Sequence, residues 1–151
     1  MANERILALA RDLTRVAPRS ARAPLGPYGV IAARALDKCR AELADRAGSY
    51  HYNCSLDRSF FDFTGIDAAE FKQFVATGAS DEEVDQWIRE NTTQKDPKAI
   101  MKWNNEMIGL RLCDLSESTQ EYFETYIPQF CKPESKVKFF FDVYDVEEGV
   151  L

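Results

Sequence analysis

Gly48-Ser-Tyr-His-Tyr-Asn-Cys-Ser-Leu-Asp-Arg-Ser-Phe-Phe-Asp-Phe-Thr-Gly65 is the stretch around which the sequence is organised. It holds His51, the only histidine of the 151-residue chain, together with one of four cysteines and five tyrosine or phenylalanine rings. Apolar rings and hydrogen-bonding groups share these eighteen positions between two predicted helices. This mixture is typical of a ligand site, because rings pack while polar groups make directed contacts. The stretch contains no catalytic signature.

The segment from Tyr50 to Cys54 predicts which side chains face a ligand. In an extended segment, successive side chains point to opposite sides of the backbone. We expect the more apolar Tyr50, Tyr52 and Cys54 to face the core. His51 and Asn53 then point together at solvent or at a cleft. Imidazole and amide groups suit a polar ligand, because they both donate and accept hydrogen bonds.

Other polar residues extend this hypothesis or offer an alternative to it. Asp57 and Asp62 suit acid–base chemistry, although Asp57 stands where a helix begins and can simply cap it. Asn104 is unusual inside a predicted helix, so its amide is expected to bond a loop or line a pocket. The alternative for His51 is burial, with a bond to a backbone carbonyl or to Asp62. The predicted ligand-binding residues are His51, Asn53, Tyr50, Tyr52, Asp57 and Asn104.

Mainly α-helical structure is predicted on both sides of this stretch. A helix over 29–46 has apolar residues at spacings of four, three and four, and its mixed charges are interpreted as a solvated face. Further helices are predicted from capping patterns at Asp67, Ser80, Asp96 and Ser116. The last of these is expected to end at Ile127, before Pro128. We predict about five to seven helices in a compact multi-helix single domain that spans residues 1–151.

The C-terminal segment changes period. Apolar residues alternate from Val137 to Val143, which is the period of a β-strand. A lone strand must pair, and its partner is residues 108–112, residues 50–54 or the same strand of a second subunit. The last option corresponds to a homodimer. The predicted fold class is therefore mainly α with a short C-terminal β-strand or hairpin.

Charge divides the chain into a basic leader and an acidic body. Residues 1–28 are predicted as a short helix followed by a proline- and arginine-rich extended arm, and residues 29–151 as the helical body with its C-terminal strand. The net charge is +4 over residues 1–46 and −10 over residues 47–151. An acidic body disfavours nucleic acid, since phosphate contacts need basic residues. The arm is expected to dock on the protein's own acidic surface, and contact with an external anion is the alternative.

The four cysteines predict neither a metal centre nor a disulfide scaffold. Their spacings of 15, 59 and 18 residues include no Cys-x-x-Cys pair, and His51 with Cys54 forms a single His-x-x-Cys. We therefore expect reduced thiols, no metal and no cofactor. No apolar run approaches the roughly 20 residues of a membrane span, and the N-terminus lacks a signal-peptide layout. A cytoplasmic protein is expected.

Several motifs carry a family resemblance: Pro18-Arg-Ser20, Leu25-Gly-Pro-Tyr28, Leu36-Asp-Lys-Cys-Arg-Ala-Glu-Leu43, Tyr50-His-Tyr-Asn-Cys-Ser-Leu-Asp57, Phe61-Asp-Phe-Thr-Gly-Ile-Asp67, Lys102-Trp-Asn-Asn105 and Phe141-Asp-Val-Tyr-Asp-Val146. With these, the chain resembles the bacterial family catalogued as domain of unknown function 5069, over nearly its whole length. It differs from the family pattern at Gly26-Pro-Tyr28, usually Gly-Gly-Tyr, and at Asn53-Cys-Ser55, often Asn-Cys-Pro. The resemblance implies no activity, because none is established for the family.

Two classes of function are compatible with these observations. The first is a small-molecule- or protein-binding module with an adaptor or regulatory role. The second is a small enzyme with a pocket around His51 and Cys54. The sequence has no Gly-x-Ser-x-Gly elbow, no Gly-x-Gly-x-x-Gly and no Walker loop, which excludes those routes to hydrolysis and nucleotide binding. An enzyme needs His51 in a concave site with convergent polar groups.

Overall fold

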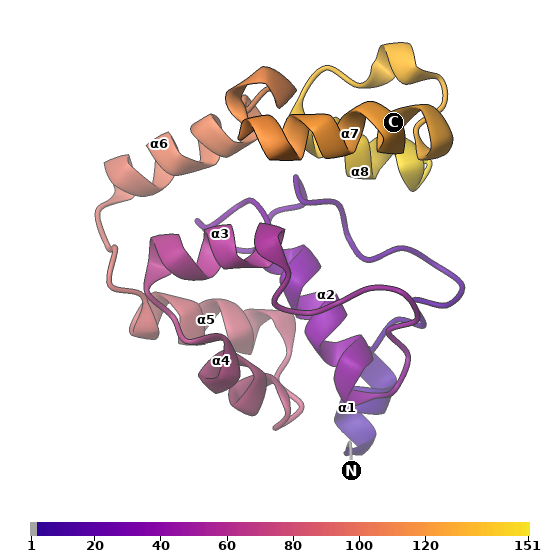
Figure 1. The fold of residues 1–151 in the computed structure, drawn as a ribbon. Coiled ribbons are helices and arrows are strands. Elements are labelled where there is room, and N and C mark those ends of the chain that lie inside the picture. The colour runs from indigo at the N-terminus through magenta and orange to yellow at the C-terminus, as the bar shows by residue number, and fades with distance from the viewer. Residues whose placement is uncertain (1–2) are drawn as a thin grey trace.

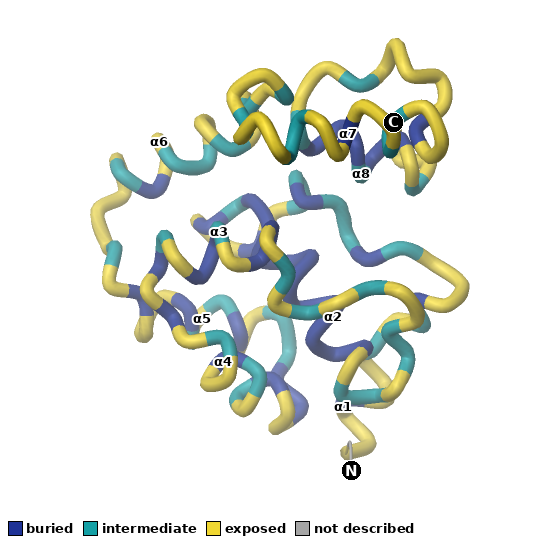
Figure 2. Tube along the Cα trace, viewed as in Figure 1, coloured by how far each residue is buried: buried dark blue, intermediate teal, exposed yellow. Residues whose placement is uncertain are grey.

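Helix α2 (Ala32–Leu43) lies at the centre of the structure (Figure 1). The computed structural model describes residues 3–151. From Ala32 to Ala41 every residue of α2 is buried, and the tube in Figure 2 is dark along this helix. A helix buried all round is usually apolar, yet four of these residues are charged: Arg34, Asp37, Lys38 and Arg40. The solvated face predicted for this helix is therefore wrong where Lys38 lies.

Each buried charge on α2 pairs with an opposite charge from another part of the chain. The closest distances between side-chain nitrogen and oxygen atoms are 2.7 Å for Arg34–Glu148, 2.9 Å for Asp37–Arg19, 2.9 Å for Lys38–Asp57 and 2.8 Å for Arg40–Asp81. Charged groups are buried in proteins when they are paired, because an unpaired charge loses its hydration without compensation. These pairs connect α2 to the N-terminal arm, to two other helices and to the C-terminal end of the chain.

Four helices lie around α2 in the lower part of Figure 1: α1 (Glu4–Leu9), α3 (Ser55–Thr64), α4 (Ala68–Val75) and α5 (Asp81–Asn91). The predicted caps of α4 and α5 are confirmed. The Asp67 carboxylate accepts hydrogen bonds from the first N–H groups of α4, and Ser80 forms a capping box with Glu83. The short helix predicted at the start of the N-terminal leader is confirmed as α1 and ends at Leu9. Beyond it the chain turns away, and the Leu13 N–H bonds the Arg46 carbonyl at 2.8 Å.

Helix α6 (Pro97–Ile108) leads from this group to the upper layer in Figure 1, which contains α7 (Glu117–Phe130) and α8 (Phe140–Glu147). Short 3₁₀ turns at Leu112–Asp114 and Glu134–Lys136 precede these two helices. The predicted end of α7 at Ile127 is wrong. The helix continues past Pro128, and the Cys131 N–H closes its last turn on the Ile127 carbonyl at 2.9 Å.

Helix α8 replaces the predicted C-terminal strand. The Asp142 side chain accepts hydrogen bonds from the backbone N–H groups of Lys138 and Phe139, both at 2.8 Å, and so caps the start of the helix. The structure therefore has eight α-helices over residues 3–151, more than the predicted number.

The alternating pattern has a different cause from the one expected. Phe141 belongs to the main hydrophobic core, whereas Val143 belongs to a smaller cluster with Phe123 of α7. Phe141 and Val143, the two alternating positions that lie within α8, thus face different cores. Val137 and Phe139 precede the helix. Among residues 3–151, one isolated antiparallel bridge joins Arg111 to Phe139. Because the segment is helical from Phe140 on, it does not form the strand for which a partner was predicted, and the homodimer stays a prediction.

The N-terminal arm has no helix between α1 and α2, as predicted, and it docks on acidic groups of the chain itself. Arg19 bonds Asp37 and Asp81, and Arg22 bonds Asp142 and Asp145 in α8. Arg22 thereby fastens the upper layer to the arm. Across residues 3–151, no helix has both the length and the apolar character that crossing a membrane requires.

Candidate functional site

A cavity of about 250 Å³ lies where α2 and the loop before α3 meet the upper layer. Its walls come from α2, residues 49–54, the first turn of α3, and the C-terminal helices α7 and α8. We call it the junction cavity. Its lining includes Arg34, Lys38, Tyr50, His51, Cys54 and Tyr144. Most of these side chains carry charge or hydrogen-bonding groups, so the site is polar for its size.

A turn places Cys54 at the start of α3. Asn53 has a φ of 61°, in the left-handed region that asparagine tolerates better than most residues. Its N–H donates to Asp57 Oδ2 at 2.9 Å, which fixes the turn against the first turn of the helix. Cys54 is consequently the N-cap residue of α3. The sulfur lies near the positive end of a ten-residue helix, where negative charge is favoured.

Lys38 lies between a carboxylate and this sulfur. Its Nζ is 2.9 Å from Asp57 Oδ2 and 3.1 Å from Cys54 Sγ. The Lys38 and Asp57 side chains are 4% and 0% exposed, so both charges are withdrawn from water. Asp57 Oδ1 is buried and has no hydrogen-bond partner within residues 3–151. A thiol beside an ammonium group and a helix N-terminus is the environment of nucleophilic cysteines.

The other cysteines lie in different surroundings. Cys39 is buried, and burial raises the pKa of its thiol to about 12. Burial also raises the pKa of Cys131. Cys113 is exposed and does not line the junction cavity. All four are free thiols, and Cys54 is the one that lines the junction cavity.

A second ion pair, between Arg34 and Glu148, also lines the cavity. Arg34 donates to both carboxylate oxygens of Glu148, at 2.8 and 2.7 Å, and Tyr50 donates to the same carboxylate at 2.8 Å. The Arg34 guanidinium carbon also lies 5.0 Å from the ring centroid of Tyr144. Burial and the bond to Glu148 raise the pKa of Tyr50, so its hydroxyl stays protonated as a donor at neutral pH. This part of the lining is rigid, because every group in it is tied to another element.

His51 is the residue of the junction cavity whose side chain is free to contact a bound molecule. It is exposed, lines the junction cavity and makes no hydrogen bond to the described residues 3–151. The alternation predicted for an extended segment is not observed, because residues 52 and 53 form a turn. Tyr50 and Cys54 line the same cavity as His51, whereas Asn53 is exposed outside it. The imidazole is therefore available to a bound molecule, either as a hydrogen-bonding group or as a proton carrier.

The six predicted residues do not all meet in one place. Tyr50 and His51 line the junction cavity. Asp57 does not line it, but it forms an ion pair with Lys38, which does. Asn53 supports the turn with its backbone. Tyr52 donates to the Ala68 carbonyl at 2.6 Å and packs on core aromatic rings. Asn104 lies at a separate cavity and bonds the backbone at the Pro27–Val30 turn.

Several residues of the site were missed from the sequence: Arg34, Lys38, Tyr144 and Glu148. A signal for the first two exists. Arg34 and Lys38 are four positions apart, which places both on one face of the same helix. The signal is ambiguous because surface helices carry the same spacing. Within the described part of the chain, His, Cys, Asp and Glu do not form any group of three or more suited to a metal ion.

Comparison with known proteins identifies the family but not an activity. No curated protein matches the sequence. A family model described as Domain of unknown function (DUF5069) matches residues 15–150. Every residue that lines the junction cavity, and the docked part of the arm with Arg19 and Arg22, falls within that range. The chain belongs to the family described as Domain of unknown function (DUF5069).

Proposed function

We propose that this protein binds a small polar molecule in the junction cavity. The observation that carries the proposal is an unpartnered His51 imidazole in the same cavity as Cys54 and the buried cation Lys38. A volume of about 250 Å³ is slightly below the roughly 300–1,000 Å³ of sites for drug-sized ligands. The ligand is accordingly a compact metabolite and not a peptide or a polymer.

The groups around the cavity define the chemistry of this ligand. Lys38 uses two of its three N–H donors, on Asp57 and Cys54, which leaves one for a bound acceptor. His51 supplies a donor or an acceptor from the rim. Glu147, which accepts a bond from Tyr126, adds carboxylate capacity on the side of α8. A ligand that carries both acceptor and donor groups satisfies this arrangement best, such as an amino acid or a hydroxy acid.

Thermal unfolding with a panel of single polar metabolites tests the proposal. A ligand of the junction cavity raises Tm in a concentration-dependent way, because it binds the folded state. His51→Ala should remove the shift while leaving the Tm of the free protein nearly unchanged. Asn53→Gly is the matched control, since it removes a neighbouring exposed side chain and accepts the positive φ. A shift that survives His51→Ala but not Asn53→Gly would reject this cavity as the site.

A thiol-dependent enzyme is the second candidate, favoured by the 3.1 Å contact between Lys38 Nζ and Cys54 Sγ. In its first step, Cys54 Sγ forms a bond to an electrophilic carbon and the leaving group departs with the bonding electrons. The Lys38 ammonium stabilises charge at the sulfur, and His51 in the same cavity takes the thiol proton and passes it to the departing group. With p-nitrophenyl acetate, the acetyl group should then appear on Cys54 and not on Cys113. Equal acetylation of the two thiols would reject this candidate.

The four free thiols also support a reducing setting, which corresponds to the cytoplasm. Both candidate functions fit this location, because each uses Cys54 as an unmodified thiol.

A further inference from the structure

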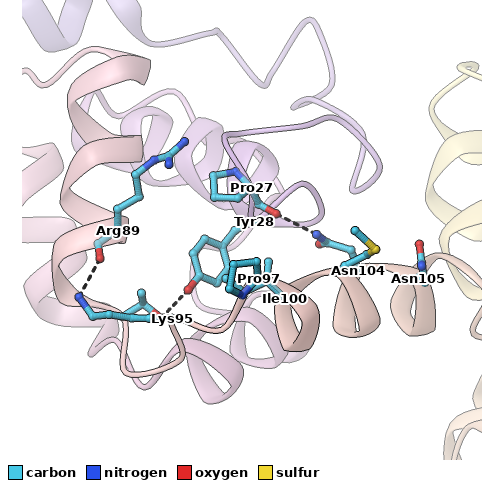
Figure 3. Close-up of a pocket in the computed structure, with 10 residues that line it drawn as sticks. Pro27, Tyr28, Arg89, Lys95, Pro97, Ile100, Asn104 and Asn105 are labelled. Atoms are coloured by element: carbon cyan, nitrogen blue, oxygen red, sulfur yellow. Dashed lines mark hydrogen bonds between the residues drawn. The ribbon is translucent and has the colours of Figure 1, made fainter.

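A larger cavity, of about 600 Å³, lies on another part of the molecule (Figure 3). It opens between the Pro27–Tyr28 turn, the loop that follows α5 and residues 97–105 of α6. None of the ten residues that line it also lines the junction cavity. We call it the α6 cavity.

Hydrogen bonds hold the walls of the α6 cavity in place. Tyr28 is buried, and its hydroxyl bonds Thr92 Oγ1 at 2.8 Å and also the Gln94 carbonyl. Asn104 of α6 donates to the Pro27 carbonyl at 2.9 Å, as Figure 3 shows. The turn, the loop and the helix are thereby joined to one another. A site built in this way needs no rearrangement to accept a ligand.

The lining combines an apolar surface with positive charge. Pro27, Pro97 and Met101 provide an apolar surface beside the Tyr28 ring, while Lys95 and Arg89 are the charged residues. No carboxylate lines the cavity, although the chain as a whole has a net charge of −6.

The two cations are not equivalent. Arg89 forms an ion pair with Asp85, with Nε 3.1 Å from Oδ2. Lys95 has no ion pair with the described residues 3–151, and its Nζ donates to the Arg89 carbonyl at 3.1 Å. This bond satisfies a carbonyl near the C-terminal end of α5 and leaves two N–H donors of Lys95 unused. The positive charge available to a ligand is therefore that of Lys95.

We infer that the α6 cavity binds a small organic anion with an apolar body, of the class of aromatic or aliphatic carboxylates. The apolar surface covers the body of the molecule, and Lys95 contacts its anionic group. The simpler interpretation assigns Lys95 only the bond to the Arg89 carbonyl at the end of α5. The two interpretations predict different effects of ligand charge. If Lys95 only bonds the Arg89 carbonyl, a negatively charged ligand and a neutral ligand of the same shape should bind equally well.

Two fluorescent dyes with nearly the same rings separate these interpretations. 1-Anilinonaphthalene-8-sulfonate carries a negative charge, and N-phenyl-1-naphthylamine is its uncharged counterpart. We expect saturable binding of the sulfonate with a stoichiometry of one. Lys95→Gln should weaken sulfonate binding roughly fivefold, the effect of one partly exposed ion pair. The same variant should leave binding of the neutral dye unchanged.

Further variants provide the controls. Lys102→Gln removes an exposed lysine of α6 that does not line this cavity and should change neither dye. Met101→Asp places a carboxylate in the cavity at an exposed position and should weaken the sulfonate more than the neutral dye. Equal effects on both dyes, or binding that neither Lys95→Gln nor Met101→Asp alters, would overturn the inference. Sulfonate binding should also leave the alkylation rate of Cys54 unchanged, which distinguishes this site from the junction cavity.

Discussion

The Lys38 ammonium lies 2.9 Å from the Asp57 carboxylate, with both side chains almost completely shielded from water. Lys38→Met should therefore lower the free energy of unfolding by about 3–5 kcal/mol, because it leaves the Asp57 charge buried without a partner. Lys72→Met is the matched control: Lys72 pairs with Glu42 at 2.8 Å near the surface, and its loss should cost about 1 kcal/mol or less. Urea denaturation measures both. Equal losses would show that the buried pair has no special energetic role.

Acid should destabilise the protein through its paired carboxylates. Burial alone raises the pKa of Asp81, but hydrogen bonds and charge from Arg19 and Arg40 outweigh burial and lower that pKa. A carboxylate with a lowered folded-state pKa contributes stability that is present above its unfolded pKa of about 3.9 and is lost as pH falls through the folded value. Unfolding free energy should accordingly fall below about pH 4.

Asp81→Asn tests the source of this dependence. The difference in unfolding free energy between about pH 6 and about pH 3 should shrink in this variant. Asp62→Asn, at an exposed carboxylate without an ion pair among residues 3–151, should retain the difference seen in the unmodified protein. An undiminished pH dependence in Asp81→Asn would remove Asp81 from the explanation.

The helical structure of α8 predicts unequal losses of stability for two phenylalanine substitutions, whereas a strand predicts similar losses. Phe141 is 0% exposed and Phe139, two residues earlier, is 37% exposed. Phe141→Ala should cost about 3–5 kcal/mol, whereas Phe139→Ala should cost about 1 kcal/mol or less. In a strand the two rings share one face and the two losses should be similar. Urea denaturation of the two variants therefore distinguishes the alternatives.

Alanine substitutions at two glycines with positive φ distinguish the cost of backbone strain from the cost of steric overlap. Gly26 and Gly149 have φ values of 60° and 74°. A Cβ atom at Gly26 would lie 1.8 Å from Asp85 Oδ1, whereas nothing lies within 4 Å of one at Gly149. Gly149→Ala should cost about 1 kcal/mol. Gly26→Ala should cost about 1–3 kcal/mol more, because Asp85 must move. Similar losses would show that Asp85 moves freely.

The parts of the fold that could be predicted are the local ones. The caps at Asp67 and Ser80 depend on residues within one turn of the helix start, so the sequence contains both partners of each interaction side by side. The buried charges of α2 depend on distant partners. Arg34 and Glu148 are 114 positions apart, and nothing near Arg34 indicates that a carboxylate will arrive there. A mixed-charge helix then resembles a surface helix.

The candidate site likewise has residues that the sequence could predict and residues that it could not. His51 and Tyr50 were found because rings and polar groups are concentrated in one short stretch. Lys38 was missed because its role depends on the turn at Asn53, which brings Asp57 and Cys54 to it. The period of two near the C-terminus was misleading because α8 packs against two cores, a relationship that exists only in three dimensions.

Alkylation of Cys54 by iodoacetamide tests occupancy of the junction cavity most directly. Peptide mass spectrometry follows Cys54 and the exposed Cys113 in the same sample, so Cys113 serves as an internal standard. We predict that the polar metabolite that raises Tm slows alkylation of Cys54 and leaves Cys113 unchanged, and that His51→Ala abolishes this protection. Alkylation of Cys54 at the same rate with and without that metabolite would contradict binding in the junction cavity.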